Sequence, residues 1–115
     1  MYFKKSQNST LIEWTRHALE KMKYYRLSIP RLKRLLKNPD HQQEGIVPGT
    51  IALMQYTNSK KTSEIWLMYQ ALGKGKKKII TVWRYPGRSP KQPFLSLPPE
   101  ENLDSLIKII NLKRD

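Results

Sequence analysis

One stretch near the N-terminus carries side chains suited to acid–base chemistry on a phosphate. His17, Lys21 and Tyr24 are spaced at i, i+4 and i+7, so in a helix all three project from one face. Histidine exchanges protons near neutral pH, lysine neutralises a phosphate, and tyrosine stacks on a base or donates a hydrogen bond. Together they suit transesterification at a ribose 2′-hydroxyl. The alternative is a solvated helix face whose histidine packs locally.

A second candidate residue is Arg84, which lies at the end of a strand-like run just before a Pro-Gly turn. An arginine there could bind a scissile phosphate through two parallel hydrogen bonds and stabilise its developing charge. Strand alternation predicts that Arg84 shares a face with Ile80 and Val82. The competing interpretation is a structural ion pair with Glu64, a residue that is either a general base or a cross-strand partner.

Positive charge is concentrated in the middle of the chain. The protein has 22 Lys and Arg against 9 Asp and Glu, and residues 46–97 contain nine of these bases but only one acid, together with aromatic residues that include Trp66, Tyr69, Trp83 and Tyr85. Charge interleaved with flat rings is typical of surfaces that bind single-stranded nucleic acid. A purely solubilising role for the lysines is the alternative. We expect RNA-binding side chains at Lys23, Tyr24, Arg26, Lys76, Lys77, Trp83, Tyr85 and Arg88.

Composition disfavours several other kinds of chemistry. The chain has no cysteine, so it has no thiol nucleophile, disulfide or cysteine-ligated metal. Its two histidines lack a supporting carboxylate cluster, and the Gly-Lys-Gly-Lys segment at 73–76 is a turn, so we expect no metal and no cofactor. No apolar leader or membrane-length segment occurs. We expect a soluble cytoplasmic protein with no membrane partner.

Two helices must position the histidine face. Thr15 is a favourable N-cap for a helix from residue 16 to about 26, and Ser28 is a favourable N-cap for a second helix. The two helices form a hairpin over residues 14–38. Residues 1–13 are predicted to be a polar lead-in.

The rest of the chain predicts an antiparallel sheet followed by one helix. Within residues 46–86, three runs rich in β-branched and aromatic residues are joined by short connections, which favours a meander. Both faces of this sheet are largely apolar, so either could face the core. A proline-rich segment over 87–99 leads to a C-terminal helix over 100–112. The predicted fold over 14–115 is one α+β domain with a helical hairpin, a three- or four-stranded antiparallel sheet and a C-terminal helix.

The segment Thr15-Arg16-His17-Ala18, followed by Met22 and Arg26-Leu27-Ser28, resembles the His-Ala box of small domains of unknown function grouped with RelE- and BrnT-like toxins. The resemblance covers about residues 14–86 and implies a RelE-like fold. The characterised toxins cleave RNA with basic and aromatic residues instead of a metal, usually under control of an antitoxin encoded beside them. By this resemblance His17 is the box histidine, Lys21 stands near a basic position, and Arg84 ends the sheet.

We therefore expect an RNA-directed protein, and first a metal-independent endoribonuclease of the toxin–antitoxin (mRNA interferase) type. Its catalytic residues would be His17, Lys21 and Arg84. The alternative is a non-catalytic RNA-binding module, ribosome-associated or not, that uses the same basic and aromatic face. The expected partners are RNA, either single-stranded or ribosome-bound, and an acidic antitoxin-like protein.

Overall fold

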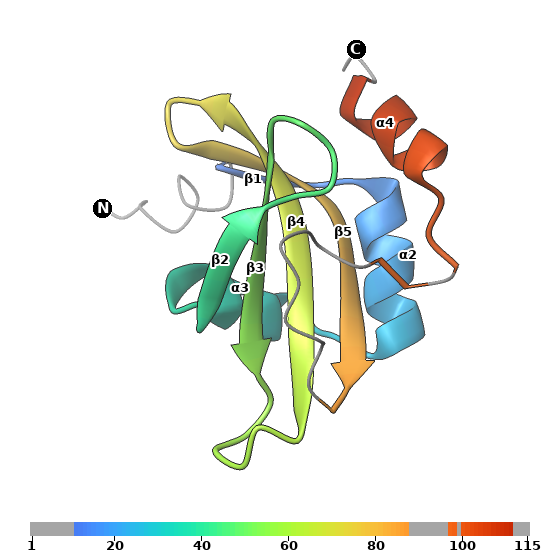
Figure 1. Ribbon diagram of the computed structural model, residues 1–115. Coiled ribbons are helices and arrows are strands. Elements are labelled where there is room, and N and C mark those ends of the chain that lie inside the picture. The colour runs from blue at the N-terminus through green and yellow to red at the C-terminus, as the bar shows by residue number, and fades with distance from the viewer. Residues whose placement is uncertain (1–10, 88–96, 99, 112–115) are drawn as a thin grey trace.

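The computed structural model describes residues 11–87, 97–98 and 100–111. Within these residues the chain forms three helices and one five-stranded mixed sheet, which confirms the α+β class (Figure 1). The elements in chain order are β1 (Ile12–Trp14), α2 (Arg16–Tyr25), α3 (Ile29–Lys37), β2 (His41–Glu44), β3 (Thr50–Tyr56), β4 (Ser63–Gly73), β5 (Lys76–Pro86) and α4 (Leu103–Asn111).

The sheet has the strand order β1-β5-β4-β3-β2. The meander of β3, β4 and β5 is antiparallel as predicted, but β1 runs parallel to β5 and the sheet has five strands, so the expectation of a purely antiparallel sheet of three or four strands is wrong. β1 spans the end of the expected lead-in and the first residue of the expected hairpin, and β2 lies between the hairpin and the expected sheet, where no strand was predicted. Both are short edge strands that side-chain patterns do not mark, because main-chain pairing with one neighbour defines them.

The helix starts follow the predicted caps in the hairpin but not in α4. The Thr15 hydroxyl accepts a hydrogen bond from the Ala18 amide at 3.0 Å, and the Ser28 hydroxyl accepts one from the Arg31 amide at 3.2 Å. The C-terminal helix was expected from residue 100, but α4 begins at Leu103, and the Asn102 side chain caps it. Residues 100 and 101 are therefore free of the helix and can reach α2.

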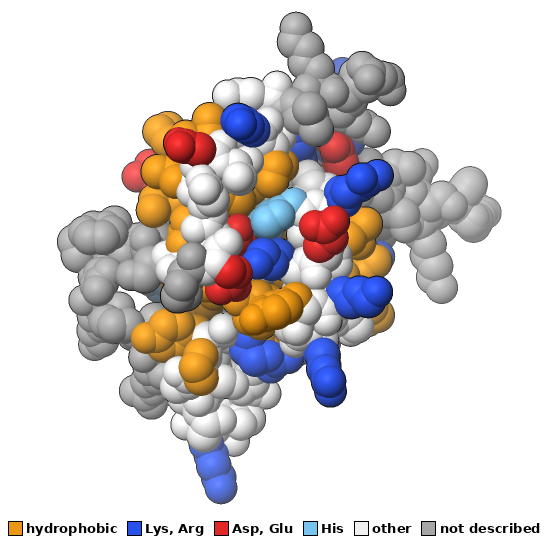
Figure 2. Space-filling view, turned by 90° about the vertical axis from the view of Figure 1, so that its right-hand side faces the viewer, with side chains coloured by type: hydrophobic (Ala, Val, Ile, Leu, Met, Phe, Trp, Pro, Cys, Tyr) orange, Lys and Arg blue, Asp and Glu red, His pale blue; other side chains and the backbone are white. Residues whose placement is uncertain are grey.

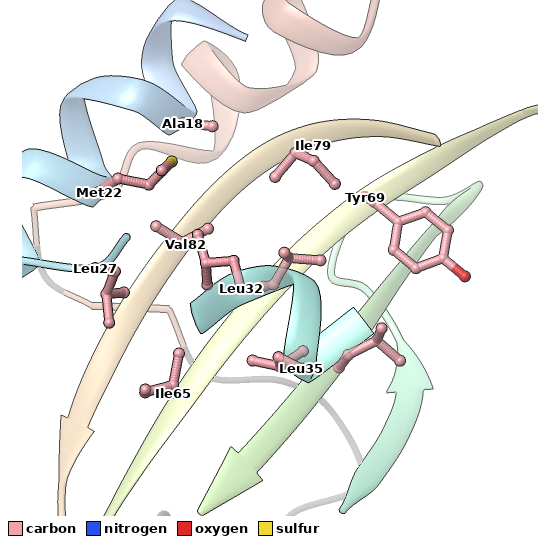
Figure 3. Close-up of a cluster of buried hydrophobic side chains, with 11 residues drawn as sticks. Ala18, Met22, Leu27, Leu32, Leu35, Ile65, Tyr69, Ile79 and Val82 are labelled. Carbon is pink, nitrogen blue, oxygen red and sulfur yellow. The ribbon is translucent and has the colours of Figure 1, made fainter. Parts of the chain in front are cut away.

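Both faces of the sheet are buried. On one face α2 and α3 cover a cluster that includes Leu32, Leu35 and Leu67 (Figure 3). On the other face Trp66, Met68 and Trp83 pack with residues that include Leu106 of α4. Each face of the sheet thus has its own hydrophobic core.

A β-bulge in β5 changes which residues share a face. The register shifts between Met68 and Tyr69 of β4, so that Thr81 pairs with Met68 while Ile79 pairs with Tyr69. Ile79 and Val82 therefore belong to the α2–α3 cluster, and Ile80 belongs to the opposite one. The prediction that Arg84 shares a face with Ile80 and Val82 is therefore confirmed for Val82 and wrong for Ile80.

No helix in the described part of the chain is long and apolar enough to cross a bilayer.

Candidate functional site

An open pocket of about 390 Å³ lies where α2 meets α3, next to the C-terminal end of β5. We call it the arginine pocket, because four of its eight lining residues are arginines and none of them is acidic. The lining residues are Arg26, Leu27, Ser28, Arg31, Arg34, Thr57, Ile65 and Arg84. Guanidinium groups bind phosphate oxygens through two parallel N–H bonds, so the pocket has the chemistry of an oxyanion site.

Three elements bring these arginines together. Arg26 directly follows α2 in the left-handed conformation, with φ of 58°, and Arg31 and Arg34 are one turn apart on α3. Arg84 of β5 donates a hydrogen bond from Nη2 to the Tyr25 carbonyl at 3.1 Å, so its charge lies at the negative end of the α2 dipole. Arg31 is held from the sheet, because its guanidinium donates to the Gln55 side chain and to the Tyr56 carbonyl.

The positive charges in the pocket repel one another. Burial lowers the pKa of Arg31 from its ordinary value, and the charges of Arg34 and Arg84 lower it further, while Asp40 acts in the opposite direction. The guanidinium still carries its charge at neutral pH. An anion bound among these groups would relieve the repulsion, which favours binding of a phosphate.

The second candidate site, the His17 cluster, joins α2 to the segment before α4. Nε2 of His17 lies 2.9 Å from Oε1 of Glu101, whose carboxylate also accepts a hydrogen bond from the Thr81 hydroxyl. One turn along α2, Nζ of Lys21 lies 3.5 Å from Oε2 of Glu100. Figure 2 shows this side of the molecule, with a histidine side chain among acidic and basic ones.

Tyr25 completes the His17 cluster, because its hydroxyl donates to the Glu100 carboxylate. Burial raises the pKa of Tyr25 well above its ordinary value, and the bond to Glu100 raises it further, so the phenol stays protonated. Burial would also raise the pKa of Glu101, but the hydrogen bonds from His17 and Thr81 outweigh it and lower that pKa. Likewise, burial opposes but does not prevent a lowered pKa at Glu100, because Tyr25 and Lys21 stabilise its carboxylate.

The His17 cluster has the arrangement of a proton-transfer pair. The Glu101 side chain is only 1% exposed, whereas His17 is 24% exposed, so a buried carboxylate orients an imidazole that reaches solvent. Sequence reasoning missed Glu100 and Glu101 because it placed both in a helix start. The sequence signal that could have identified them is that they are two adjacent acids in a strongly basic chain.

The structure places the three expected catalytic residues in two clusters. His17 and Lys21 belong to the His17 cluster, whereas Arg84 belongs to the arginine pocket. His17 is in the first turn of α2, and Arg84 contacts its last residue, Tyr25, which is about 12 Å further along the helix axis. Tyr25 links the two sites, since its carbonyl binds Arg84 and its hydroxyl binds Glu100.

The expected RNA-binding residues divide into surface and core. Lys23 and Arg26 are exposed, and Tyr24 is 70% exposed. Trp83 is 2% exposed and stacks on Trp66, so its ring is in the core and does not reach a base.

The remaining expected residues lie elsewhere. Tyr85 is half-buried beside the Trp66–Trp83 cluster. Lys76 and Lys77 are half-buried at the end of β5 opposite Arg84, and Nζ of Lys77 lies 5.5 Å from the centroid of the Tyr69 ring. Arg88 lies outside the described residues.

The proposed ion pair between Arg84 and Glu64 does not form. Arg84 pairs in register with Ile65, on the α2–α3 side of the sheet, whereas Glu64 lies on the side of Trp66. The buried Glu64 carboxylate accepts a hydrogen bond from Nε1 of Trp66 at 2.8 Å. The burial of Glu64 and its bond to Trp66 fit a structural role for this residue.

No group of three or more His, Cys, Asp or Glu side chains that could hold a metal ion occurs among the described residues. No protein-family model matches the chain, and comparison with curated proteins and with solved structures found no match.

Stability is expected to fall with pH below about 4.5, the ordinary pKa of a glutamate, because the pKa values of Glu100 and Glu101 are lowered in the folded protein. The stabilisation is complete above 4.5 and is lost as pH falls through the lower folded values. Hydrogen bonds to a charged group contribute about 1.5–3 kcal/mol, which sets the expected loss at Glu101. Urea unfolding at pH 7, 4.5 and 3 measures it. An identical pH profile for the Glu100→Gln/Glu101→Gln variant would contradict this origin.

Proposed function

We propose that this protein binds RNA through its phosphates, and that the arginine pocket is the main contact. The observation that carries the proposal is a pocket lined by four arginines and by no acid. Phosphate contacts supply most of the affinity in nucleic-acid binding, and Arg is the residue best shaped for them. The segment Thr15–Ala18 resembles the His-Ala box of small domains grouped with RelE- and BrnT-like toxins, and because the characterised toxins cleave RNA, this resemblance favours RNA over DNA.

The surface next to the pocket supports a single-stranded ligand. Lys23 and Tyr24 precede Arg26 on the last turn of α2 and are exposed, so a strand bound in the pocket can extend along this turn. The exposed Tyr24 ring offers a face for base stacking, which contributes about 1–3 kcal/mol per base.

Binding is tested by fluorescence anisotropy with labelled single-stranded RNA in excess EDTA over a series of salt concentrations. We expect binding that weakens steeply with salt, because bound phosphates release counterions. Binding that is absent at low salt, by a protein whose folding circular dichroism has verified, would reject the proposal.

A second candidate function is metal-independent endoribonuclease activity of the toxin type, and the contact between His17 and Glu101 favours it. His17 would transfer the proton at the ribose, Lys21 would stabilise the phosphate, and Arg84 would hold a neighbouring phosphate. Glu100 occupies Lys21 in this structure, so an RNA phosphate would have to replace that carboxylate at Lys21, whereas Glu101 would keep its contact with His17. The same contacts support the proposal of an acidic antitoxin-like partner, because they show that carboxylates fit this face.

Cleavage in EDTA is expected to fall by about 10²–10⁴-fold in the His17→Asn variant if His17 transfers a proton. Asparagine keeps a donor toward Glu101, whereas alanine would leave the buried carboxylate with only the hydrogen bond from Thr81, at a cost of about 1.5–3 kcal/mol for the lost bond. The control is His41→Asn, because His41 is exposed on β2. If the wild-type protein binds RNA but does not cleave it, the nuclease function is rejected and only the binding function stands. Equal cleavage by the His17→Asn and His41→Asn variants would exclude a role for His17 in the reaction.

A further inference from the structure

We propose that the arginine pocket takes a phosphate group carrying two or more negative charges, namely a terminal phosphate or a short polyphosphate, in preference to an internal phosphodiester. The 5′ end of an RNA and a free polyphosphate both present this chemistry. This inference rests on the proposed function only in taking RNA as the molecule that carries the phosphate group. It specifies which part of the RNA the pocket recognises.

The number of charges in the pocket favours a terminal phosphate. An internal phosphodiester carries one negative charge, whereas a terminal phosphate monoester carries about 1.5–2 at neutral pH, and each further phosphate adds to it. The pocket presents four guanidinium groups, and none of its lining residues is acidic. One phosphodiester would neutralise only part of this charge. A terminal di- or triphosphate matches it far better.

The pocket also has hydrogen-bond donors available for an anion. Among the described residues, the guanidinium groups of Arg26 and Arg34 have no hydrogen-bond or ion-pair partner, although both line the pocket. Arg84 and Arg31 are fixed by main-chain and side-chain contacts, and each guanidinium has five N–H groups. Two guanidinium groups are thus held in place and two are free to close on the anion.

The other lining residues of the pocket are suited to an anion and not to a base. None of the residues that line the pocket is aromatic, so the pocket has no ring on which a base next to the bound phosphate could stack. Its two apolar lining residues, Leu27 and Ile65, are themselves buried in the core. Ser28, the N-cap of the nine-residue helix α3, also lines the pocket and turns the positive end of that helix toward it. The pocket is therefore expected to recognise the charge of its ligand and not the identity of the bases.

The test compares one RNA sequence with a 5′-hydroxyl, a 5′-monophosphate or a 5′-triphosphate, and inorganic triphosphate alone, all in EDTA. We expect affinity to rise at least 10-fold from the hydroxyl to the triphosphate end. Arg34→Gln should remove most of this preference, and Lys33→Gln, which removes the same charge from an exposed neighbour on α3, should keep it. Arg26→Gly should also remove it while folding at least as well, because glycine suits the left-handed conformation at this position.

The outcomes separate this inference from the proposed function. Equal affinity for hydroxyl and triphosphate ends would overturn the inference and leave RNA binding standing. Inorganic triphosphate bound with Arg34 dependence, but no RNA bound, would support the inference with free polyphosphate as the source and overturn RNA binding. Binding of neither ligand would overturn both.

Discussion

Replacement of Trp83 by alanine is expected to lower the free energy of unfolding by about 3–5 kcal/mol. The Trp83 ring is 2% exposed and is stacked in parallel on Trp66 at a centroid distance of 5.7 Å. It lies on the face of the sheet that packs with Leu106 of α4, so its removal leaves a large cavity between sheet and helix. A loss of this size is a large share of the 5–15 kcal/mol by which single domains are stable.

Urea unfolding measures this loss, and Trp83→Phe gives a milder variant that should keep the fold. The matched control is Tyr24→Ala, which removes an aromatic ring that is 70% exposed and should change stability by about 0.5 kcal/mol or less. The two variants are expected to divide the aromatic residues by role, with Tyr24 affecting RNA affinity and Trp83 affecting stability. A stable Trp83→Ala protein with weakened RNA binding would instead place Trp83 on the binding surface.

The double variant Arg34→Gln/Arg84→Gln is expected to bind single-stranded RNA about 100-fold more weakly, since each phosphate-binding arginine contributes on the order of 1.4 kcal/mol, or tenfold. Both residues line the arginine pocket, from α3 and from β5. The slope of log K against log salt should become shallower by about 1.4, because two phosphate contacts on a single strand contribute about 0.7 each. Anisotropy titrations at several salt concentrations measure both quantities.

The control for this variant is Lys33→Gln/Lys37→Gln, which makes the same change in net charge at two exposed positions of α3. It should weaken binding only a few-fold. Arg84 also binds the Tyr25 carbonyl, so thermal unfolding must show that the pocket variant is folded. An equal loss in the two double variants would mean that net charge, and not the pocket, binds RNA.

Local interactions made much of the fold predictable. The caps at Thr15 and Ser28 act within four residues, so the sequence alone located the starts of α2 and α3. The β-branched and aromatic composition of three runs, together with the short connections between them, was enough to predict the meander. The start of α4 was predicted too early, because Pro98 and the two glutamates that follow it form an equally favourable helix start. In the structure Asn102 caps the helix instead.

The candidate site was less predictable, because its members come from distant segments. The helical spacing of His17 and Lys21 was sufficient to place them on one face, but their partners Glu100 and Glu101 come from the other end of the chain. Arg84 was identified as a phosphate-binding candidate from its place at a strand end. Its neighbours Arg31 and Arg34 were not, because on sequence they are ordinary charges of an amphipathic helix.

The sequence by itself thus determined the α+β class, the hairpin helices, the antiparallel meander and an excess of positive charge, all of which depend on composition or on contacts within a few residues. Only the tertiary structure decided that β1 pairs in parallel with β5, and that Trp83 is core. It also decided that Arg84 and His17 lie in separate clusters. The physical reason is that strand pairing, a one-residue bulge and the docking of residues 100–101 on α2 are long-range choices among competing contacts, which no local pattern encodes.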